Sequence, residues 1–335
     1  MIRALLSPNM SEVYRHKVYL ILTKPKDSIS SHVIRRLAAI NDTLRIYVAC
    51  PSSHQQQAER IIPAIDEKCV LLSYNRLGTK EQVESNATTL IEAIQEDHID
   101  GMMINFSGIS SDFQQPTEAT GLLEMAETKL VGENMLVQKL LRKGLLHGSS
   151  RIIYSSTEAA RGLPKMGFPI PTFADKTLEC ILSYMDGSGY AQPLQWEHSY
   201  SYIHCIQVLY MMAFAKKHPQ LYLCSISPGM TQESFSIENH AVKSWSNQIQ
   251  LWIYYYLLFP WLKYAEIAKE STEAAEMFFL ALTANSEWQY MSGTFVAAQV
   301  GTAGPICDQT ETPNGAMFLD DELQELAYQA IQKYL

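Results

Sequence analysis

Arg151-Ile-Ile-Tyr-Ser-Ser156 opens the stretch of sequence that decides the fold, and Leu221-Tyr-Leu-Cys-Ser-Ile-Ser-Pro-Gly229 closes it. Both runs are short and rich in apolar, strand-forming residues, and both end in hydroxyl or turn residues, which predicts two buried strands. Between them, Tyr200-Ser-Tyr-Ile-His-Cys-Ile-Gln-Val-Leu-Tyr210 has the apolar spacing of a helix. A strand, a helix and a strand in this order direct their hydroxyl side chains at a common cleft.

The same alternation of strand and helix patterns runs through the chain before Arg151. Strands are predicted at 18–23, 44–50, 70–74 and 100–105, and helices at 28–40, 55–65, 80–95 and 122–146. Strands that alternate with helices form parallel βαβ units, whose crossovers are right-handed. The sequence therefore predicts an α/β fold with a doubly wound, Rossmann-like parallel sheet, in which 1–335 form one domain.

Composition excludes several classes of protein. The chain has 335 residues, 47% of them hydrophobic, which is enough to bury one large core. Its net charge of −9 and the lack of a basic run argue against nucleic-acid or anionic-membrane partners. The most apolar window, 251–262, is too short for a membrane span, which needs roughly 20 residues. Six scattered cysteines and no signal-peptide pattern favour a cytoplasmic protein, and no Cys/His cluster predicts a metal site.

The order of these segments resembles the short-chain dehydrogenase/reductase superfamily over most of the chain. Ser156 is similar to the family's catalytic serine, and Tyr200 with His204 resembles its Tyr-x-x-x-Lys motif with the lysine replaced. The long insertion at 157–199 is similar to that of the branch that holds the retinol dehydrogenases and protochlorophyllide reductase.

Two further elements carry the resemblance. Pro228-Gly229 is similar to the turn that faces the nicotinamide, and Asn105-Phe-Ser-Gly108 resembles the family's Asn-Asn-Ala-Gly element. The resemblance implies hydride transfer between NADP or NAD and a bulky apolar carbonyl or alkene, in a homo-oligomer. It also implies that the tyrosine donates the proton and that the serine binds the same oxygen.

An aromatic block follows at 235–268, including Trp245, Trp252 and Trp261. The resemblance implies a helical lid over an apolar pocket, and a subunit contact is the alternative. A helix with a capping-box-like start is predicted from Ser271 to Leu282, a strand at 290–296 and a closing helix at 320–334.

The phosphate-binding glycines of the family are missing. Aligned from Thr23, the glycine positions hold Lys24, Ser28 and Ser30, and no glycine precedes Gly78. Those glycines allow the tight turn and the close approach of backbone to pyrophosphate, so side chains there compromise dinucleotide binding. Serines can also cap a helix and donate to phosphate, and Lys24 can offset phosphate charge, which leaves binding in a shifted pose open.

The family lysine is also lost. A tyrosine with a pKa near 10 needs a neighbouring cation to work near neutrality, and His204, with a pKa near 6.5, supplies less charge. Lys129 aligns near the asparagine that positions a proton-relay water. Lys129 is interpreted either as a replacement cation or, preferably, as an exposed lysine on a solvated helix face.

Each candidate residue also has a purely structural interpretation. Ser156 is then a strand-end hydroxyl, Tyr200 is a core tyrosine with Tyr202 as its rival for the catalytic position, and His204 is a hydrogen-bonded helix residue.

Two functional hypotheses therefore remain. The first is an NADP- or NAD-dependent reductase of atypical or impaired activity. The second is a pseudo-dehydrogenase that has lost the cofactor and acts as a binding or assembly partner.

Overall fold

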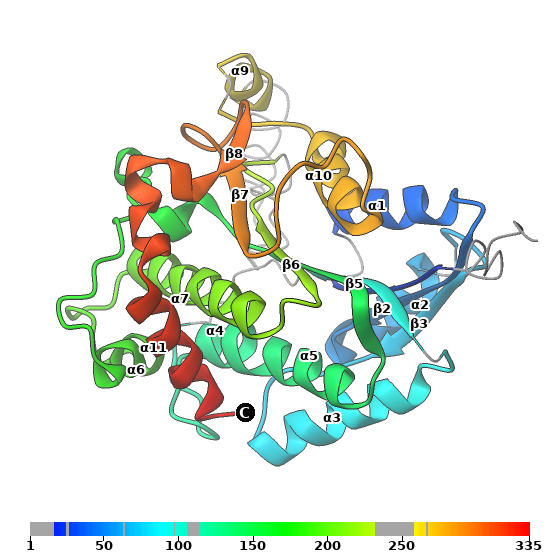
Figure 1. Ribbon diagram of the computed structural model, residues 1–335, viewed down its shortest axis with the longest axis horizontal. Helices are drawn as coiled ribbons and strands as arrows, with labels where there is room; N and C mark the ends of the chain where they lie inside the picture. Colours follow the sequence, from blue (N-terminus) through cyan, green and yellow to red (C-terminus); the bar gives the residue numbers. More distant parts are fainter. Residues whose placement is uncertain are drawn as a thin grey trace, which may run out of the picture.

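The computed structural model describes residues 17–24, 27–62, 64–96, 98–105, 114–231, 258–265 and 267–335. It confirms the predicted α/β fold, with one eight-stranded sheet in the order β3-β2-β1-β4-β5-β6-β7-β8 (Figure 1). The strands are β1 Lys17–Thr23, β2 Thr43–Cys50, β3 Cys69–Ser73, β4 Ile99–Asn105, β5 Leu146–Ser155, β6 Tyr222–Ile226, β7 Thr294–Ala298 and β8 Ile306–Asp308. Neighbours from β3 to β7 are parallel, whereas β8 pairs antiparallel with β7.

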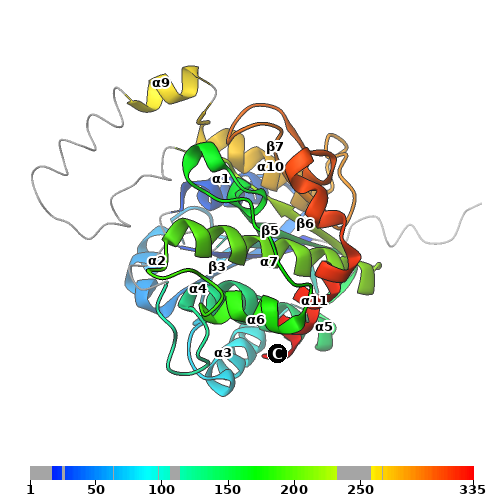
Figure 2. The same ribbon diagram turned by 90° about the vertical axis from the view of Figure 1, so that its left-hand side faces the viewer.

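Helices cover both faces of the sheet (Figures 1 and 2). One apolar core includes side chains of α1, α2 and α10, and the other includes side chains of α3, α5, α6, α7 and α11. The helices are α1 Ser28–Ala38, α2 Gln55–Ile61, α3 Lys80–Ala93, α4 Glu124–Ala126, α5 Glu133–Arg142, α6 Leu178–Asp186, α7 Trp196–Lys217, α9 Phe259–Tyr264, α10 Ser271–Thr283 and α11 Asp321–Gln332.

The central helix on the second face is α7. Its residues from Ser201 to Ala215 are all buried, because the sheet lies on one side and α6 and α11 lie on the other (Figure 2). A helix that is apolar all round is expected in such a position. It begins at Trp196, one turn before the predicted start at Tyr200, so Tyr200 and His204 both lie inside regular helix.

Three details differ from the predictions. The insertion at 157–199 contains α6, which no periodicity had indicated. The predicted capping box at Ser271 is wrong, because Glu270 holds the extended N-cap conformation and Ser271 is already helical and buried. The last parallel strand starts at Thr294, directly after Gly293, whose φ of 82° forms the preceding turn.

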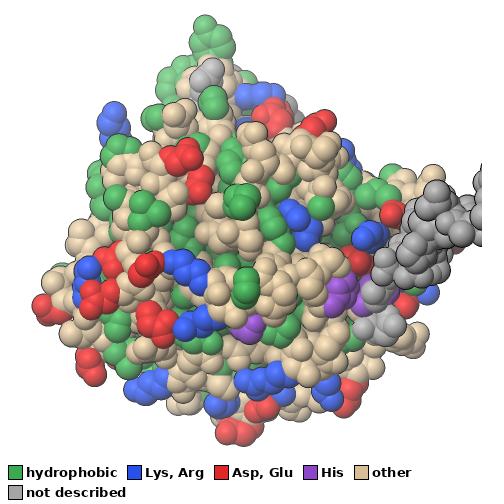
Figure 3. All heavy atoms as spheres, in the orientation of Figure 1, with side chains coloured by type: hydrophobic (Ala, Val, Ile, Leu, Met, Phe, Trp, Pro, Cys, Tyr) green, Lys and Arg blue, Asp and Glu red, His purple; other side chains and the backbone are tan. Residues whose placement is uncertain are grey.

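The aromatic block falls mostly outside the described residues, which resume at 258 with α9. There, the side chains of Trp261 and Tyr264 are 57% and 89% exposed. Among the described helices, none combines the length and apolarity needed to cross a membrane. On the face drawn in Figure 3, Lys and Arg side chains are interspersed with Asp and Glu.

Candidate functional site at the carboxyl ends of the strands

The strand order reverses between β1 and β4, and ligands of doubly wound proteins bind at the carboxyl ends of strands near this point. Thr23 ends β1 directly beside Asn105 at the end of β4. Ser155 ends β5 beside Ile226 at the end of β6. The predicted cofactor residues and the predicted reactive residues therefore lie at one edge of the sheet.

In the part of the chain that the structure describes, Ser156 and Tyr200 are linked only through Thr157, which follows Ser156 in sequence and influences the Tyr200 hydroxyl. Ser156 follows β5, donates its backbone N–H to the carbonyl of Ile226 at 2.8 Å, and is 5% exposed. Its Oγ has no hydrogen-bond partner among the described residues. The side chain of Thr157, the next residue, lies close enough to the hydroxyl of Tyr200 to lower its pKa. The rival Tyr202 instead donates its hydroxyl to the carbonyl of Thr172 at 3.1 Å.

The electrostatics around Tyr200 oppose proton transfer near neutral pH. The pKa of Tyr200 is raised to about 12, first by burial and also by the charge of Glu158, and the nearby Thr157 side chain offsets this only in part. Within the described chain, no cation is among these influences. The arrangement lacks the positive charge that lowers the pKa of a catalytic tyrosine.

His204 does not supply that charge. Its ring centroid lies 4.6 Å from that of Tyr200, and the residue is 4% exposed. Burial lowers the pKa of His204 well below 6.5, and the charge of Lys129 lowers it as well, against the smaller influence of the nearby Gln207 side chain. The imidazole is therefore neutral at neutral pH, where the family lysine is a cation.

The preferred interpretation of Lys129 as an exposed lysine is wrong. It lies in a π-helical stretch, Glu127–Gly132, which joins α4 to α5, and it is 6% exposed. Its Nζ is 3.7 Å from Oε1 of Glu133 and 3.5 Å from the carbonyl oxygen of Ser155, to which it donates. Burial lowers the pKa of Lys129, and the charge of Glu133 counteracts this. π-Helical turns occur often at functional sites.

Glu133 lies at the centre of a cluster of buried charged and polar side chains. Besides Lys129, Nη1 of Arg76 lies 3.4 Å from its Oε1, and Nε2 of Gln207 donates to its Oε2 at 3.2 Å. Glu133 is 0% exposed, and burial raises its pKa against the two cations. The sequence analysis did not find this cluster, although the i,i+4 spacing of Lys129 and Glu133 was a usable signal.

The titration of His204 gives a testable pH dependence. Because its pKa is depressed in the folded state, the unfolded chain binds the extra proton once the pH falls below about 6.5. Stability then falls with falling pH by up to about 1.4 kcal/mol per pH unit. Chemical denaturation from about pH 7 to about pH 5 should show this slope in the wild type and a shallower one in His204→Gln. Parallel slopes would contradict a buried neutral imidazole.

At the other end of the site, the start of α1 is occupied by a carboxylate of the chain itself. Asp27 is the N-cap, and its Oδ1 accepts from the backbone N–H of Ser30 at 2.6 Å. The same Oδ1 accepts from Nδ2 of Asn105 at 3.0 Å, and that nitrogen also donates to Oγ of Ser30 at 2.9 Å. We call this set of three residues, Asp27, Ser30 and Asn105, the α1 latch.

The α1 latch does not fit a dinucleotide pyrophosphate. A helix N-terminus binds phosphate through free N–H groups and a positive dipole end, and here the N–H of Ser30 donates to the Asp27 carboxylate, which also occupies the positive end of the dipole. The buried side chain of Ser30 fills the place of the last glycine, and Oγ of Ser28 is buried as well. Thr23 donates its hydroxyl to the carbonyl of Lys24 at 3.2 Å.

The Pro228-Gly229 turn is present and tightly packed. Gly229 has a φ of 72° and donates its N–H to Oγ of Ser227 at 3.2 Å. A Cβ at Gly229 would stand 2.2 Å from the carbonyl oxygen of Thr302 and 2.7 Å from Cε of Lys269. Gly108, the other predicted glycine of the site, lies outside the described residues.

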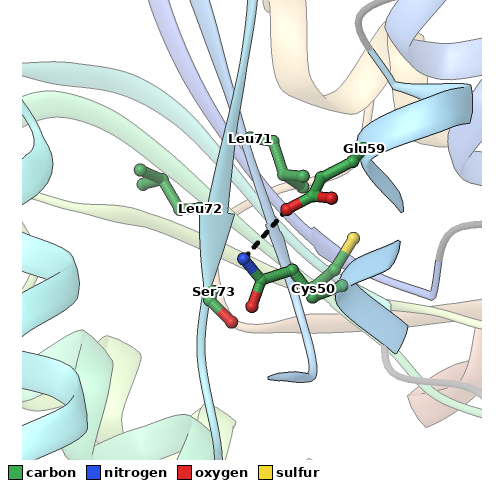
Figure 4. A pocket seen from close by; sticks show the side chains of 6 residues that line it. Cys50, Glu59, Leu71, Leu72 and Ser73 are labelled. Carbon is green, nitrogen blue, oxygen red and sulfur yellow. Dashed lines mark hydrogen bonds between the residues drawn. The ribbon is translucent and has the colours of Figure 1, made fainter. Parts of the chain in front are cut away.

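A separate cavity of about 270 Å³ lies toward the far edge of the sheet, at the ends of β2 and β3 (Figure 4). Its wall includes Cys50, Leu72 and Ser73, and Nε2 of Gln55 donates to Oε1 of Glu59 across its side at 3.0 Å. β1 and β4 separate it from β5 and β6, so it is not part of the reactive end.

Among the described residues, no three His, Cys, Asp or Glu side chains form a group that could hold a metal ion. No protein-family model matches the sequence, and no curated protein matches it.

Solved structures resemble the chain at low identity. An uncharacterized protein from Mycobacterium paratuberculosis is 14% identical with a TM-score of 0.57, covering 95% of this chain and 94% of that chain. A short-chain dehydrogenase/reductase from Serratia marcescens is 12% identical with a TM-score of 0.51, covering 84% and 96%. A short-chain dehydrogenase from Salmonella enterica serovar Typhi is 12% identical with a TM-score of 0.52, covering 86% and 98%. The chain therefore has the fold of the short-chain dehydrogenases/reductases.

Proposed function

We propose that this protein is a pseudo-dehydrogenase, which keeps the dehydrogenase fold without tight binding of NADP or NAD and acts as a binding or assembly partner. The observation that carries the proposal is the α1 latch. The Asp27 carboxylate accepts from the N–H of Ser30, one of the groups that a pyrophosphate would use, and its charge repels a second anion at the same place.

The reactive end supports the same conclusion. The Tyr200 pKa of about 12, the neutral His204 and the pairing of Lys129 with Glu133 leave the predicted catalytic tyrosine without a cation. Each of these three features by itself weakens proton transfer by Tyr200, and therefore ordinary dehydrogenation. Together with the α1 latch, they affect both cofactor binding and proton transfer.

An impaired NADP- or NAD-dependent reductase of a bulky apolar carbonyl or alkene is the second candidate. The observation that favours it is the Oγ of Ser156, which is buried at the end of β5 and has no hydrogen-bond partner among the described residues, so it is available to bind a substrate oxygen. The two functions differ in one measurable property, which is the affinity for the dinucleotide.

A thermal-shift titration with NADPH and with NADH tests the proposal. A cofactor at a hundred times its dissociation constant adds about 2.7 kcal/mol of stability. We expect no shift for the wild type at millimolar cofactor. Asp27→Ser removes the charge and keeps a capping hydroxyl, so it is expected to gain affinity. A wild-type shift of the full size would refute the pseudo-dehydrogenase and leave the impaired reductase.

The proposal includes a cytoplasmic homo-oligomer. The exposed Trp261 and Tyr264 on α9 are the apolar side chains that favour an assembly surface, since tryptophan and tyrosine are enriched at interfaces. Sedimentation of the wild type and of a Trp261→Glu, Tyr264→Glu variant measures this directly.

A further inference from the structure

The cavity at the ends of β2 and β3 is used neither by the predicted reactive residues nor by the α1 latch. It measures about 270 Å³, which is near the lower end of the size range of small-molecule sites. Its wall is made by the end of β2, by β3 and by α2 (Figure 4). Among the described strands, β3 pairs with β2 alone, so the cavity lies at an edge of the sheet and is partly open to solvent.

The inner wall of the cavity is mostly apolar. Cys50 at the end of β2 is 1% exposed and stands in register with Ser73 at the end of β3. Side chains alternate along a strand, so Leu71 and Ser73 share one face of β3. Leu71 packs there against the apolar core that includes α2. Burial raises the pKa of the Cys50 thiol to about 12, so this side chain adds an uncharged surface.

The outer wall carries hydrogen-bond acceptors. Gln55 and Glu59 lie one turn apart on α2, and Nε2 of Gln55 donates to Oε1 of Glu59 at 3.0 Å. This hydrogen bond leaves Oε2 of Glu59 and the amide oxygen of Gln55 as acceptors in the wall. Ser73 adds a hydroxyl, whose Oγ lies 2.8 Å from Oγ of Ser52 and keeps a lone pair for a ligand.

The charge of this wall is negative. No lysine or arginine lines the cavity, and Glu59 makes no ion pair with any described residue. An anionic ligand would therefore meet a carboxylate that no cation neutralises. An ammonium group carries the opposite charge and donates three hydrogen bonds, which matches the three acceptors.

We propose that this cavity binds a small organic amine, whose ammonium group pairs with Glu59 and whose apolar part lies against Leu71 and Cys50. This goes beyond the proposed function, because the ligand carries no phosphate and the cavity lies apart from Ser156 and Tyr200.

Three ligands that share one apolar frame test the charge preference. Phenethylamine is a cation near neutral pH, 2-phenylethanol is neutral, and 3-phenylpropionate is an anion. Each is titrated into the full-length protein, and binding is followed by the NMR shifts of the Leu71 and Ser73 backbone amides and of the Gln55 side-chain amide. We expect the amine to bind with a dissociation constant on the order of 1 mM, about fivefold more tightly than the alcohol. The carboxylate should not bind.

Two glutamate variants separate the wall charge from the net charge. Glu59→Gln keeps the size of the side chain, so it should weaken the amine about fivefold and leave the alcohol unchanged. Glu67→Gln is the matched control, because it removes the same charge from an exposed residue outside the wall. It should leave both affinities unchanged. Ser73→Leu, which fills the cavity from β3, should abolish the binding of both ligands.

The inference is overturned if, in the wild type, the amine shifts none of the three signals at about ten times the expected dissociation constant. It is also overturned if the amine and the carboxylate bind equally well, or if Glu59→Gln and Glu67→Gln weaken the amine alike. The first two outcomes need no variant. No dinucleotide is present in these titrations, so a positive NADPH titration would remove the proposed function and leave the amine site to be decided separately.

Discussion

Glu133→Ala is expected to lower the free energy of unfolding by about 3–5 kcal/mol, because it leaves two buried cations without their carboxylate. Glu133 is 0% exposed, and it lies 3.7 Å from Nζ of Lys129 and 3.4 Å from Nη1 of Arg76. It also accepts from Gln207, so the truncation removes a hydrogen-bond acceptor together with the charge.

Glu84→Ala is the matched control for this variant. Glu84 also forms an ion pair, at 2.8 Å with Nζ of Lys139, but its side chain is 48% exposed. Exposed pairs of this kind contribute about 0–1 kcal/mol. Urea denaturation followed by circular dichroism should separate the two variants clearly. Equal losses would mean that water reaches the Glu133 cluster, and the buried network would then be the wrong description.

Gly229→Ala is the second substitution with a large expected effect. Two costs add at this position: about 1–2 kcal/mol for placing a side chain at positive φ, and about 1–3 kcal/mol for crowding the packed turn. The new Cβ would stand 2.2 Å from the carbonyl oxygen of Thr302, which belongs to the backbone and cannot rotate away. The same Cβ would stand 2.7 Å from Cε of Lys269, so that side chain would have to shift as well.

Gly121→Ala isolates the first of these costs. Its φ of 71° nearly equals the 72° of Gly229, but an added Cβ would meet no atom within 4 Å. The difference in unfolding free energy between the two alanine variants therefore measures the crowding alone. If the two variants lost the same stability, the turn would not be packed as described.

Most of the sheet was predictable, because its strands are short apolar runs separated by helical spacing. The antiparallel β8 was not, since Ile306–Asp308 has only three residues, all half-buried, and carries no alternation. The start of α10 at Ser271 was predicted correctly, but its capping was not. Ser271 matched a capping pattern, yet Glu270 in the extended conformation is the N-cap and Ser271 is the first helical residue.

In the candidate site, only those residues were predictable whose position follows from the order of strands and helices along the chain. The positions of Ser156, Tyr200 and the Pro228-Gly229 turn follow from local order, and helix spacing favoured Tyr200 over Tyr202, whose hydroxyl donates to the carbonyl of Thr172. The charge environment was not predictable, because it depends on which distant residue becomes the partner. Lys129 meets a glutamate, whereas Lys269 meets a thioether.

Many nucleotide-binding proteins are stabilised by the nucleotide that they bind, so their free energy of unfolding rises with the concentration of that nucleotide. In α1, the side chain of Asp27 caps the first turn by accepting from the N–H of Ser30. This hydrogen-bond acceptor is part of the chain itself and needs no bound ligand. Under the proposed function, no dinucleotide contributes to the stability of the fold. The free energy of unfolding is then expected to be the same at any concentration of NADPH or NADH.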